Sequence, residues 1–293
     1  MKIAVLTDSN SGITQSQAKE LGIKVIPMPF FIDGEEYLED ITLTQKDFYD
    51  KLLGDCNVST SQPASGYVTS IWDDLLKYND KIIYIPMSSG LSKSCETSKN
   101  LSLTDEYKGK VYVVDNQRIS VTQRESVMTA IDMVNKGYDC EFIVDYLLKN
   151  KLNSDIYIMV DTLTYLKKGG RITATAAKLG GFLKLKPILL IKGEKLDSFR
   201  MRNRTLENAK SIMIDAALEN INGYMKDLDG KTDNVEVSIA YSGTDSKDAL
   251  IFKEEVEKAL NTKVMFVDPL SLSVSCHIGP GALAIAITKK ISY

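Results

Sequence analysis

Histidine and cysteine are scarce in this sequence, and their scarcity limits the chemistry open to it. There is one histidine, His277, so a metal site rich in imidazole ligands is excluded, and a Ser-His-Asp or Cys-His mechanism has to use that residue. The four cysteines, Cys56, Cys95, Cys140 and Cys276, are widely spaced and form no C-x-x-C pair. Zinc ribbons and thioredoxin-like redox motifs are therefore not supported, and we expect reduced thiols and no metal.

Long apolar runs and a basic excess are also missing. No stretch approaches the roughly 18 apolar residues of a membrane-spanning helix. The N-terminal residues 1–8 are too short an apolar run for a secretion signal and predict a β-strand instead. The chain carries 36 Lys and Arg against 39 Asp and Glu, a formal net charge of −3. We therefore expect a cytoplasmic protein with no nucleic-acid partner and at most transient membrane contact.

The sequence does contain short β-branched runs that alternate with polar loops and helix-like segments. Strands are predicted at residues 3–6, 82–85, 111–114, 156–160 and 237–241, and helices at 14–21, 126–136 and 245–260. This alternation predicts an α/β protein whose parallel or mixed sheets are flanked by helices. For 293 residues we expect two domains. The polar stretch 149–155 suggests their boundary, which gives domains 1–155 and 156–293.

Familiar catalytic and nucleotide-binding motifs fail in this sequence. Gly223 and the Gly-Lys-Thr at 230–232 have the wrong spacing for a P-loop, and no G-x-S-x-G elbow is present. Residues 279–284 match G-x-G-x-x-A formally, but too few residues follow for a dinucleotide-binding βαβ unit. Asp8, Asp115 and Asp161 each follow a predicted strand. Helix capping and turn formation explain these acids, and a carboxylate-only magnesium site is the alternative.

Three polar loops remain as candidate sites. The segment Ser88–Ser92 follows a predicted strand, where hydroxyls, backbone amides and a helix dipole suit an anion, although helix capping explains the serines as well. The segment Thr60–Pro63 predicts a capped helix start with proline in the first turn. The segment Lys167–Arg171 is a basic turn, and it either faces an anion or is simply solvated.

Taken in order along the chain, these motifs resemble the DegV family. The matching segments are Thr7-Asp8-Ser9, Ser59-Thr60-Ser61-Gln62-Pro63, Ser88-Ser89-Gly90-Leu91-Ser92, Tyr165-Leu166-Lys167-Lys168-Gly169-Gly170-Arg171-Ile172, Leu185-Lys186-Pro187-Ile188-Leu189 and His277-Ile278-Gly279-Pro280-Gly281-Ala282-Leu283. The resemblance implies two α/β domains and one long-chain fatty acid in the cleft between them. It further implies a non-catalytic, lipid-binding subunit of a bacterial fatty acid kinase, whose separate kinase subunit uses ATP to make an acyl phosphate. No cofactor is implied beyond the bound fatty acid.

By the same resemblance, Thr60 and Ser89 contact the carboxylate, and Ser61, Arg171 and His277 complete the polar shell. The rival interpretation is a serine-dependent acyl hydrolase or acyltransferase that uses Ser89 with His277, and a third is a regulatory module for another small acid. Residues 30–32 and 179–190 suit an acyl tunnel and suit a core equally well.

The chain also departs from the family pattern. It departs at Lys93–Glu96, at Arg118 and Arg124, and at Ala284, where glycine is common. The basic cluster Arg200–Arg204 suits either a kinase surface or phosphate, or a solvated helix start.

Overall fold

The first domain is built on a parallel sheet. In the computed structural model, which describes residues 1–54, 56–175, 185–193, 196–226, 234–290 and 292–293, four strands lie in the order β2-β1-β6-β7. Their bounds are β1 Ile3–Asp8, β2 Lys24–Ile26, β6 Lys81–Ile85 and β7 Val111–Val113. Every neighbouring pair is parallel, so the carboxyl ends of all four strands meet at one edge. Ligands of open α/β sheets bind at this edge.

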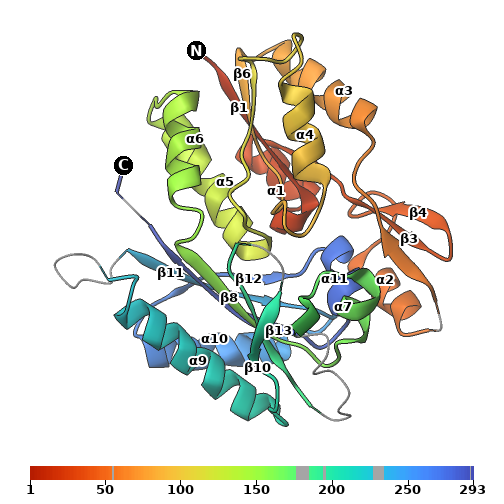
Figure 1. Ribbon diagram of the computed structural model, residues 1–293, viewed down its shortest axis with the longest axis vertical. Helices are drawn as coiled ribbons and strands as arrows, with labels where there is room; N and C mark the ends of the chain where they lie inside the picture. Colours follow the sequence, from red (N-terminus) through yellow and green to blue (C-terminus); the bar gives the residue numbers. More distant parts are fainter. Residues whose placement is uncertain (55, 176–184, 194–195, 227–233, 291) are drawn as a thin grey trace.

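Helices cover both faces of this sheet (Figure 1). They are α1 Gln15–Leu21, α3 Ser65–Leu76, α4 Ser94–Ser102, α5 Ser120–Asn135 and α6 Cys140–Lys149. One apolar cluster packs a sheet face against α1, α5 and α6, and a second packs the other face against α3 and α4. A capping box between Thr14 and Gln17 starts α1 at its predicted position.

A small antiparallel sheet extends from this domain, at the right of Figure 1. Its strands are β3 Pro29–Ile32, β4 Glu35–Leu38 and β5 Val58–Thr60, and helix α2 Gln45–Leu52 packs on it. Because Thr60 pairs with Phe30 in this sheet, it ends a strand and does not cap a helix. The predicted helix start at Thr60–Pro63 is therefore wrong. Helix α3 begins at Ser65, after Ala64, which makes no side-chain cap hydrogen bond.

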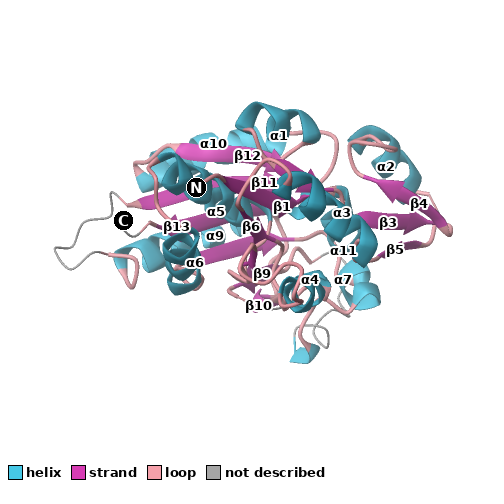
Figure 2. Cartoon of the chain, turned by 90° about the horizontal axis from the view of Figure 1, so that it is seen from above, coloured by secondary structure: helices cyan, strands magenta, loops and turns pink. Residues whose placement is uncertain are grey.

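The second domain contains a mixed six-stranded sheet in the order β10-β9-β8-β13-β11-β12. The strands are β8 Ser154–Met159, β9 Ile188–Ile191, β10 Asp197–Arg200, β11 Val235–Tyr241, β12 Val264–Pro269 and β13 Leu283–Lys289. Helices α9 Leu206–Asn222 and α10 Lys247–Leu260 cover one face, as Figures 1 and 2 show. The other face turns toward the first domain.

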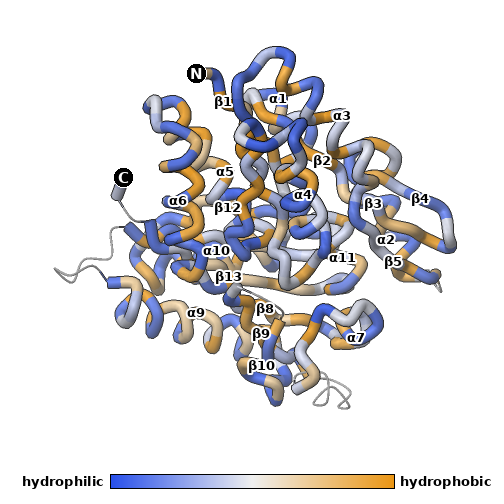
Figure 3. Tube along the Cα trace, turned by 45° about the horizontal axis from the view of Figure 1, so that its top comes forward, coloured by the Kyte–Doolittle hydropathy of each residue, from blue (hydrophilic) through white to orange (hydrophobic). Residues whose placement is uncertain are grey.

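Alternation along the strands separates the two faces of this sheet. Ile156 and Ile158 of β8 belong to the apolar cluster on the first-domain side, whereas Tyr157 and Met159 pack under α9 and α10. Successive side chains of a strand point to opposite faces, so one strand serves both layers. In Figure 3 the flanking helices show hydrophilic and hydrophobic residues in alternation, as expected for helices with one buried side.

One helix of the second half of the sequence packs against elements of both domains. Helix α11, Leu272–Ile278, packs against β3, β5 and α2, and its Leu272 and Cys276 belong to the core cluster of the small sheet. The boundary placed after residue 155 cuts through β8, because Ser154 already pairs with Thr288 in the six-stranded sheet. A division into two contiguous halves therefore describes the sheets but not this helix.

The α/β prediction is confirmed, with parallel and mixed sheets flanked by helices in two domains. The five predicted strands and three predicted helices are present, with ends that differ by a few residues. Helix α5 is the largest difference, because it starts at Ser120, six residues before the predicted position.

Candidate functional site

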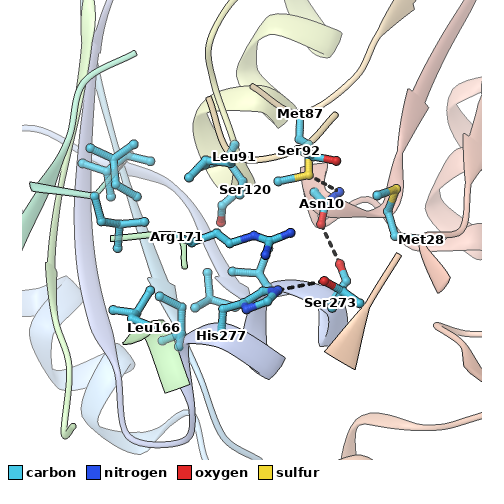
Figure 4. A pocket seen from close by; sticks show the side chains of 18 of the residues that line it. Asn10, Met28, Met87, Leu91, Ser92, Ser120, Leu166, Arg171, Ser273 and His277 are labelled. Atoms are coloured by element: carbon cyan, nitrogen blue, oxygen red, sulfur yellow. Dashed lines mark hydrogen bonds between the residues drawn. The ribbon is translucent and has the colours of Figure 1, made fainter. Parts of the chain in front are cut away.

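A cavity of about 620 Å³ lies between the two domains. On the first-domain side it is lined by Asn10, Met28 and Met87, which follow β1, β2 and β6. Figure 4 shows these side chains together with Arg171 and His277, which come from the second half of the sequence. The cavity therefore sits at the carboxyl edge of the parallel sheet, where the topology favours a ligand.

The six-stranded sheet forms an apolar wall of the cavity. Ile156 and Ile158 of β8, Ile191 of β9, Ala240 of β11 and Ala284 of β13 all line it. Ala240 pairs directly with Ala284, and Ala284 pairs on its other side with Ile158. Two small side chains on neighbouring strands thus leave room within a wall that otherwise consists of branched side chains.

Thr60, His277 and Arg171 form a polar group at the cavity. The hydroxyl of Thr60, at the end of β5, lies 2.8 Å from Nε2 of His277 in the last turn of α11. Burial lowers the pKa of His277 to about 4, and the Arg171 guanidinium contributes in the same direction. At neutral pH the imidazole is therefore uncharged, and Arg171 is the cation of this group.

Because Gly169 has no side chain, the imidazole of His277 can lie against its backbone. Helix α7, Thr164–Gly169, ends beside His277, and a Cβ added at Gly169 would lie 2.0 Å from Nδ1 of the ring. The carbonyl of Gly169 accepts a hydrogen bond from Nη1 of Arg171. The basic turn at Lys167–Arg171 is therefore more than a solvated loop, because it packs against the histidine and holds the arginine at the cavity.

Four of the five predicted ligand-binding residues line the cavity, namely Thr60, Ser61, Arg171 and His277. They come from β5, the segment after it, the segment after α7, and α11. Residues that lie more than 200 positions apart in the sequence are thus brought to one place. Their role in binding a ligand remains a prediction.

Ser89 is not among the described residues that line the cavity. Its N–H donates to Oδ1 of Asp115 at 3.2 Å, and the next three N–H groups of the loop bond to the hydroxyl or carbonyl of Ser88. The amides of this loop are satisfied within the loop and its own domain, so they do not form the anion site considered for them. The loop reaches the cavity instead through Leu91 and Ser92.

The serine that faces the cavity is therefore Ser92 rather than Ser89. Its Oγ accepts a hydrogen bond from the N–H of Ser94 at 3.1 Å, which leaves its own hydroxyl hydrogen to donate. The Ser89–His277 pair of an acyl hydrolase is not supported, because the structure pairs His277 with Thr60.

Sequence reasoning missed a polar face of α4 and the residue before it. Lys93, Glu96, Thr97 and Asn100 line the cavity, and the hydroxyl of Thr97 donates to Oε1 of Gln62 at 3.0 Å. The spacing i, i+3, i+4, i+7 was the available signal, because it places four residues on one side of a helix. Lys93 and Glu96 have side chains that are 82% and 60% exposed, so the cavity opens to solvent here.

Asn10 and Ser273 were also missed. The hydroxyl of Ser273 donates to Oδ1 of Asn10 at 2.6 Å, across 263 residues of sequence, and both line the cavity (Figure 4). Nothing in the local sequence of either residue signals this contact, because only the tertiary fold brings α11 to the end of β1.

The three acids considered as magnesium ligands bind different partners. Asp8 is fully buried and accepts from the N–H of Met87 and from Nε2 of Gln123, while burial raises its pKa. Asp161 pairs with Lys186 at 2.6 Å. Within the described parts of the chain, no group of three or more His, Cys, Asp or Glu side chains is placed to hold a metal ion.

The two arginines that depart from the family pattern form ion pairs. Arg118 pairs with Glu125, and both side chains are buried. Arg124 of α5 reaches Asp268 of β12 at 2.6 Å and lies over the ring of Phe266 at 4.4 Å. The Arg124–Asp268 pair joins the two domains. Each of the two arginines thus has an acidic partner within the protein.

The remaining predictions concern the acyl tunnel, the basic cluster and membrane contact. Phe30 and Ile32 are buried in the core of the small sheet and do not line the cavity, and residues 179–184 lie outside the described residues. Arg200 ends β10 and lies over the ring of Phe199, and α9 begins only at Leu206. No helix in the described ranges combines the length and apolar content needed to cross a membrane.

The fold and site together define a two-domain α/β protein with a largely apolar cavity between its domains and a polar group of hydroxyl, imidazole and guanidinium at that cavity. The chain belongs to the DegV family: the family model described as "Uncharacterised protein, DegV family" matches residues 2–290. A DegV domain-containing protein of Staphylococcus aureus is 26% identical over 294 residues, which cover 99% of each chain.

Solved structures support the same assignment. DegV from Bacillus subtilis, described as a fatty acid binding protein, is 27% identical with a TM-score of 0.83, and the match covers 99% of this chain and 100% of that one. A stearic acid-binding protein from Eubacterium ventriosum has a TM-score of 0.88 at 22% identity, over 98% of both chains. The second likeness shows the shared fold.

Proposed function

We propose that this protein binds one long-chain fatty acid in the interdomain cavity and presents its carboxylate to a separate fatty acid kinase. The observation that carries the proposal is the composition of the cavity, with an apolar wall from the six-stranded sheet and a polar group that contains one permanent cation, Arg171. The B. subtilis relative, which is 27% identical and described as a fatty acid binding protein, supports the same ligand class.

The tail supplies most of the binding free energy in this arrangement. Each buried methylene contributes about 0.8 kcal/mol, so about a dozen of them contribute on the order of 10 kcal/mol before the cost of ordering the chain. The polar group sets orientation instead, because a carboxylate leaves water at a cost of several kcal/mol unless it is paired and hydrogen-bonded. Arg171 supplies the pairing charge.

The direction of the Thr60–His277 hydrogen bond determines whether the Thr60 hydroxyl can donate to the ligand. If Nε2 of the neutral imidazole carries the proton and donates to Oγ1 of Thr60, then the Thr60 hydroxyl is free to donate to a carboxylate. Binding of the anion therefore favours the Nε2–H tautomer, with Nδ1 unprotonated beside Gly169. His277 acts on the ligand through Thr60 in this arrangement.

The open side of the cavity supports presentation to a second protein. Ser61 and Gln62 directly follow Thr60 in the sequence and line the cavity with it. The exposed side chains of Lys93 and Glu96 also line the cavity, near Gln62, because Gln62 accepts a hydrogen bond from Thr97. In this proposal the carboxylate lies at the polar group near this opening, so that an incoming phosphoryl group has access from the solvent side. The sequence contains no P-loop for ATP, so we assign nucleotide binding to the kinase.

Lipid extraction tests the ligand. Protein purified from a bacterial host is denatured and extracted, and we expect about one equivalent of a long-chain fatty acid by mass spectrometry. Delipidated protein that fails to bind palmitate or oleate in repeated titrations contradicts the proposal.

Acyl-phosphate formation tests the kinase role. A purified bacterial fatty acid kinase subunit, ATP and the loaded protein are combined with hydroxylamine, which traps acyl phosphate as the hydroxamate. We expect hydroxamate only when both proteins are present. Binding of fatty acid without any hydroxamate would leave a carrier whose carboxylate is not a kinase substrate, and would refute that part of the proposal.

A further inference from the structure

Helix α5 begins at the cavity, on the first-domain side. Its first two residues, Ser120 and Val121, and the preceding Ile119 all line the cavity. The helix is 16 residues long, so its N-terminus carries a partial positive charge and N–H groups without intrahelical partners. In the described part of the chain, no acceptor is found for the N–H groups of Ser120 and Val121.

The Ser120 side chain is buried and unpartnered. It is only 6% exposed, yet its hydroxyl makes no hydrogen bond to any residue that the structure describes. Helix capping does not explain it, because Thr122 performs that role, with its Oγ1 accepting from the N–H of Ile119 at 3.4 Å. In Figure 4 the Ser120 hydroxyl points into the cavity, on the side from which Arg171 extends.

The backbone of Ser120 is also in an unfavourable conformation. Its φ of 56° lies in the left-handed region, which glycine adopts at little cost and other residues rarely adopt. A glycine here would relieve the conformational cost and lose only the hydroxymethyl group. The presence of serine is consistent with a use for the hydroxyl.

We propose that the Ser120 hydroxyl and the free N–H groups at the start of α5 bind the ligand carboxylate from the first domain, while Arg171 binds it from the second. This inference rests on the proposed function and identifies a head-group position that the motif residues do not include. A carboxylate accepts about four hydrogen bonds, so donors from both domains can be used at once. Hydrogen bonds to a charged group are also the strong ones.

Paired ligands separate this role from a structural one. Palmitate and methyl palmitate share a chain and differ in charge, so the ratio of their dissociation constants reports on the carboxylate alone. In delipidated full-length protein, we expect Ser120→Ala and Ser120→Gly to weaken palmitate binding at least about tenfold and to leave methyl palmitate within about twofold. We expect Ser120→Gly to melt no lower than the wild type.

Gln117→Gly is the matched control. Gln117 lies three residues earlier in the same loop with a φ of 55°, and it does not line the cavity. We expect this variant to bind both ligands like the wild type, because it relieves backbone strain without removing a donor from the cavity lining.

The outcomes distinguish this inference from the proposed function. If the wild type binds palmitate and Ser120→Ala binds it equally well, the inference is wrong and the fatty-acid site stands. Equal losses for both ligands make Ser120 a packing residue and also overturn the inference. A wild type that binds neither ligand overturns the inference and the proposed function together.

Discussion

His277 has a neighbour at each ring nitrogen, with Thr60 at Nε2 and Gly169 beside Nδ1. Its pKa of about 4 lies below the ordinary value of 6.5 because burial penalises the charged ring. Since the chain has one histidine, its imidazole resonances need no assignment. We expect an NMR titration of the delipidated protein to show a midpoint near 4.

The same shift affects stability. The unfolded chain takes up a proton between about pH 6.5 and pH 4 and the folded protein does not, so the free energy of unfolding decreases as the pH falls through this range. The contribution is on the order of 3 kcal/mol. An imidazole midpoint near 6.5 in the folded protein would contradict the buried, neutral state.

Arg171 is predicted to bind the carboxylate as the cation of the Thr60–His277–Arg171 group. We expect Arg171→Ala to weaken palmitate binding by about 10- to 100-fold, which corresponds to about 1.5–3 kcal/mol for a hydrogen bond to a charged group. Isothermal titration calorimetry of the delipidated proteins with palmitate measures this loss of affinity. The control is Lys168→Ala, because Lys168 is also a cation of the same basic turn but does not line the cavity. Equal losses in both variants would indicate a general effect of charge rather than a specific contact.

Motif reasoning named residues that line the cavity where a motif has one arginine or one histidine, and their role in binding stays a prediction. Arg171 and His277 are single residues of their type in their segments, and both line the cavity. The segment Ser88–Ser92 offers three serines, and the tight hydrogen-bonded turn after Ser88 decides which of them faces the cavity. The residue types alone do not specify the geometry of this turn. The motif therefore predicted Ser89, whereas Ser92 lines the cavity.

At the scale of elements, helix α11 is anchored by an acid from the small sheet. Oε1 of Glu39, which follows β4, accepts the N–H of Leu272 at 2.8 Å, and burial raises the pKa of Glu39 to about 8. The folded protein therefore keeps a proton that the unfolded chain releases above about pH 4.5. The free energy of unfolding decreases as the pH rises from about 4.5 to about 8.

Glu39→Gln tests this anchor. The amide oxygen of glutamine still accepts from Leu272 but does not titrate, so we expect the variant to lose a decrease on the order of 3 kcal/mol between pH 5 and pH 8. Urea denaturation of both proteins at pH 5, 7 and 9 measures the difference. Parallel pH profiles for wild type and variant would show that Glu39 is ionised in the folded protein.

The elements themselves were predictable where the pattern is local. Continuous β-branched runs identified the central strands, because strands covered on both faces need apolar side chains at every position. The strand β5 was not identified, because its residues Val58–Thr60 form a strand only by pairing with β3. Small polar residues after it resemble a helix cap, and tertiary pairing overrides that local preference.

The whole molecule is joined by an ion pair between domains. Arg124 and Asp268 are 12% and 15% exposed, so removing one partner leaves a charge largely without solvent. We expect Arg124→Met or Asp268→Asn alone to lower the free energy of unfolding by about 2 kcal/mol, and the double variant to lose less than the sum.

The control for this cycle is an exposed pair within one helix. Lys46 and Asp50 of α2 are 76% and 61% exposed, and we expect Lys46→Met to change stability by less than about 0.5 kcal/mol. Chemical denaturation of all four proteins measures the coupling. Strictly additive losses in the Arg124 and Asp268 variants would mean that the pair does not join the domains energetically.

The division of the chain was only partly predictable at this scale. The polar stretch before β8 marks the change from one sheet to the other, and the predicted boundary lies within two residues of it. The position of α11 had no such signal, since its Leu272 and Cys276 are ordinary apolar residues whose partners, such as Phe30, lie far earlier in the sequence. Contacts of this kind depend on the finished fold.

The alanine pair Ala240–Ala284 has a consequence for how such a protein diversifies. Both alanines belong to the six-stranded sheet, whereas the polar side chains of Thr60, Arg171 and His277 come from a strand end, a loop and a helix end. If the proposed fatty acid occupies the cavity, a change in side-chain size at these two alanines would alter the room for its chain without altering the polar side chains at the cavity.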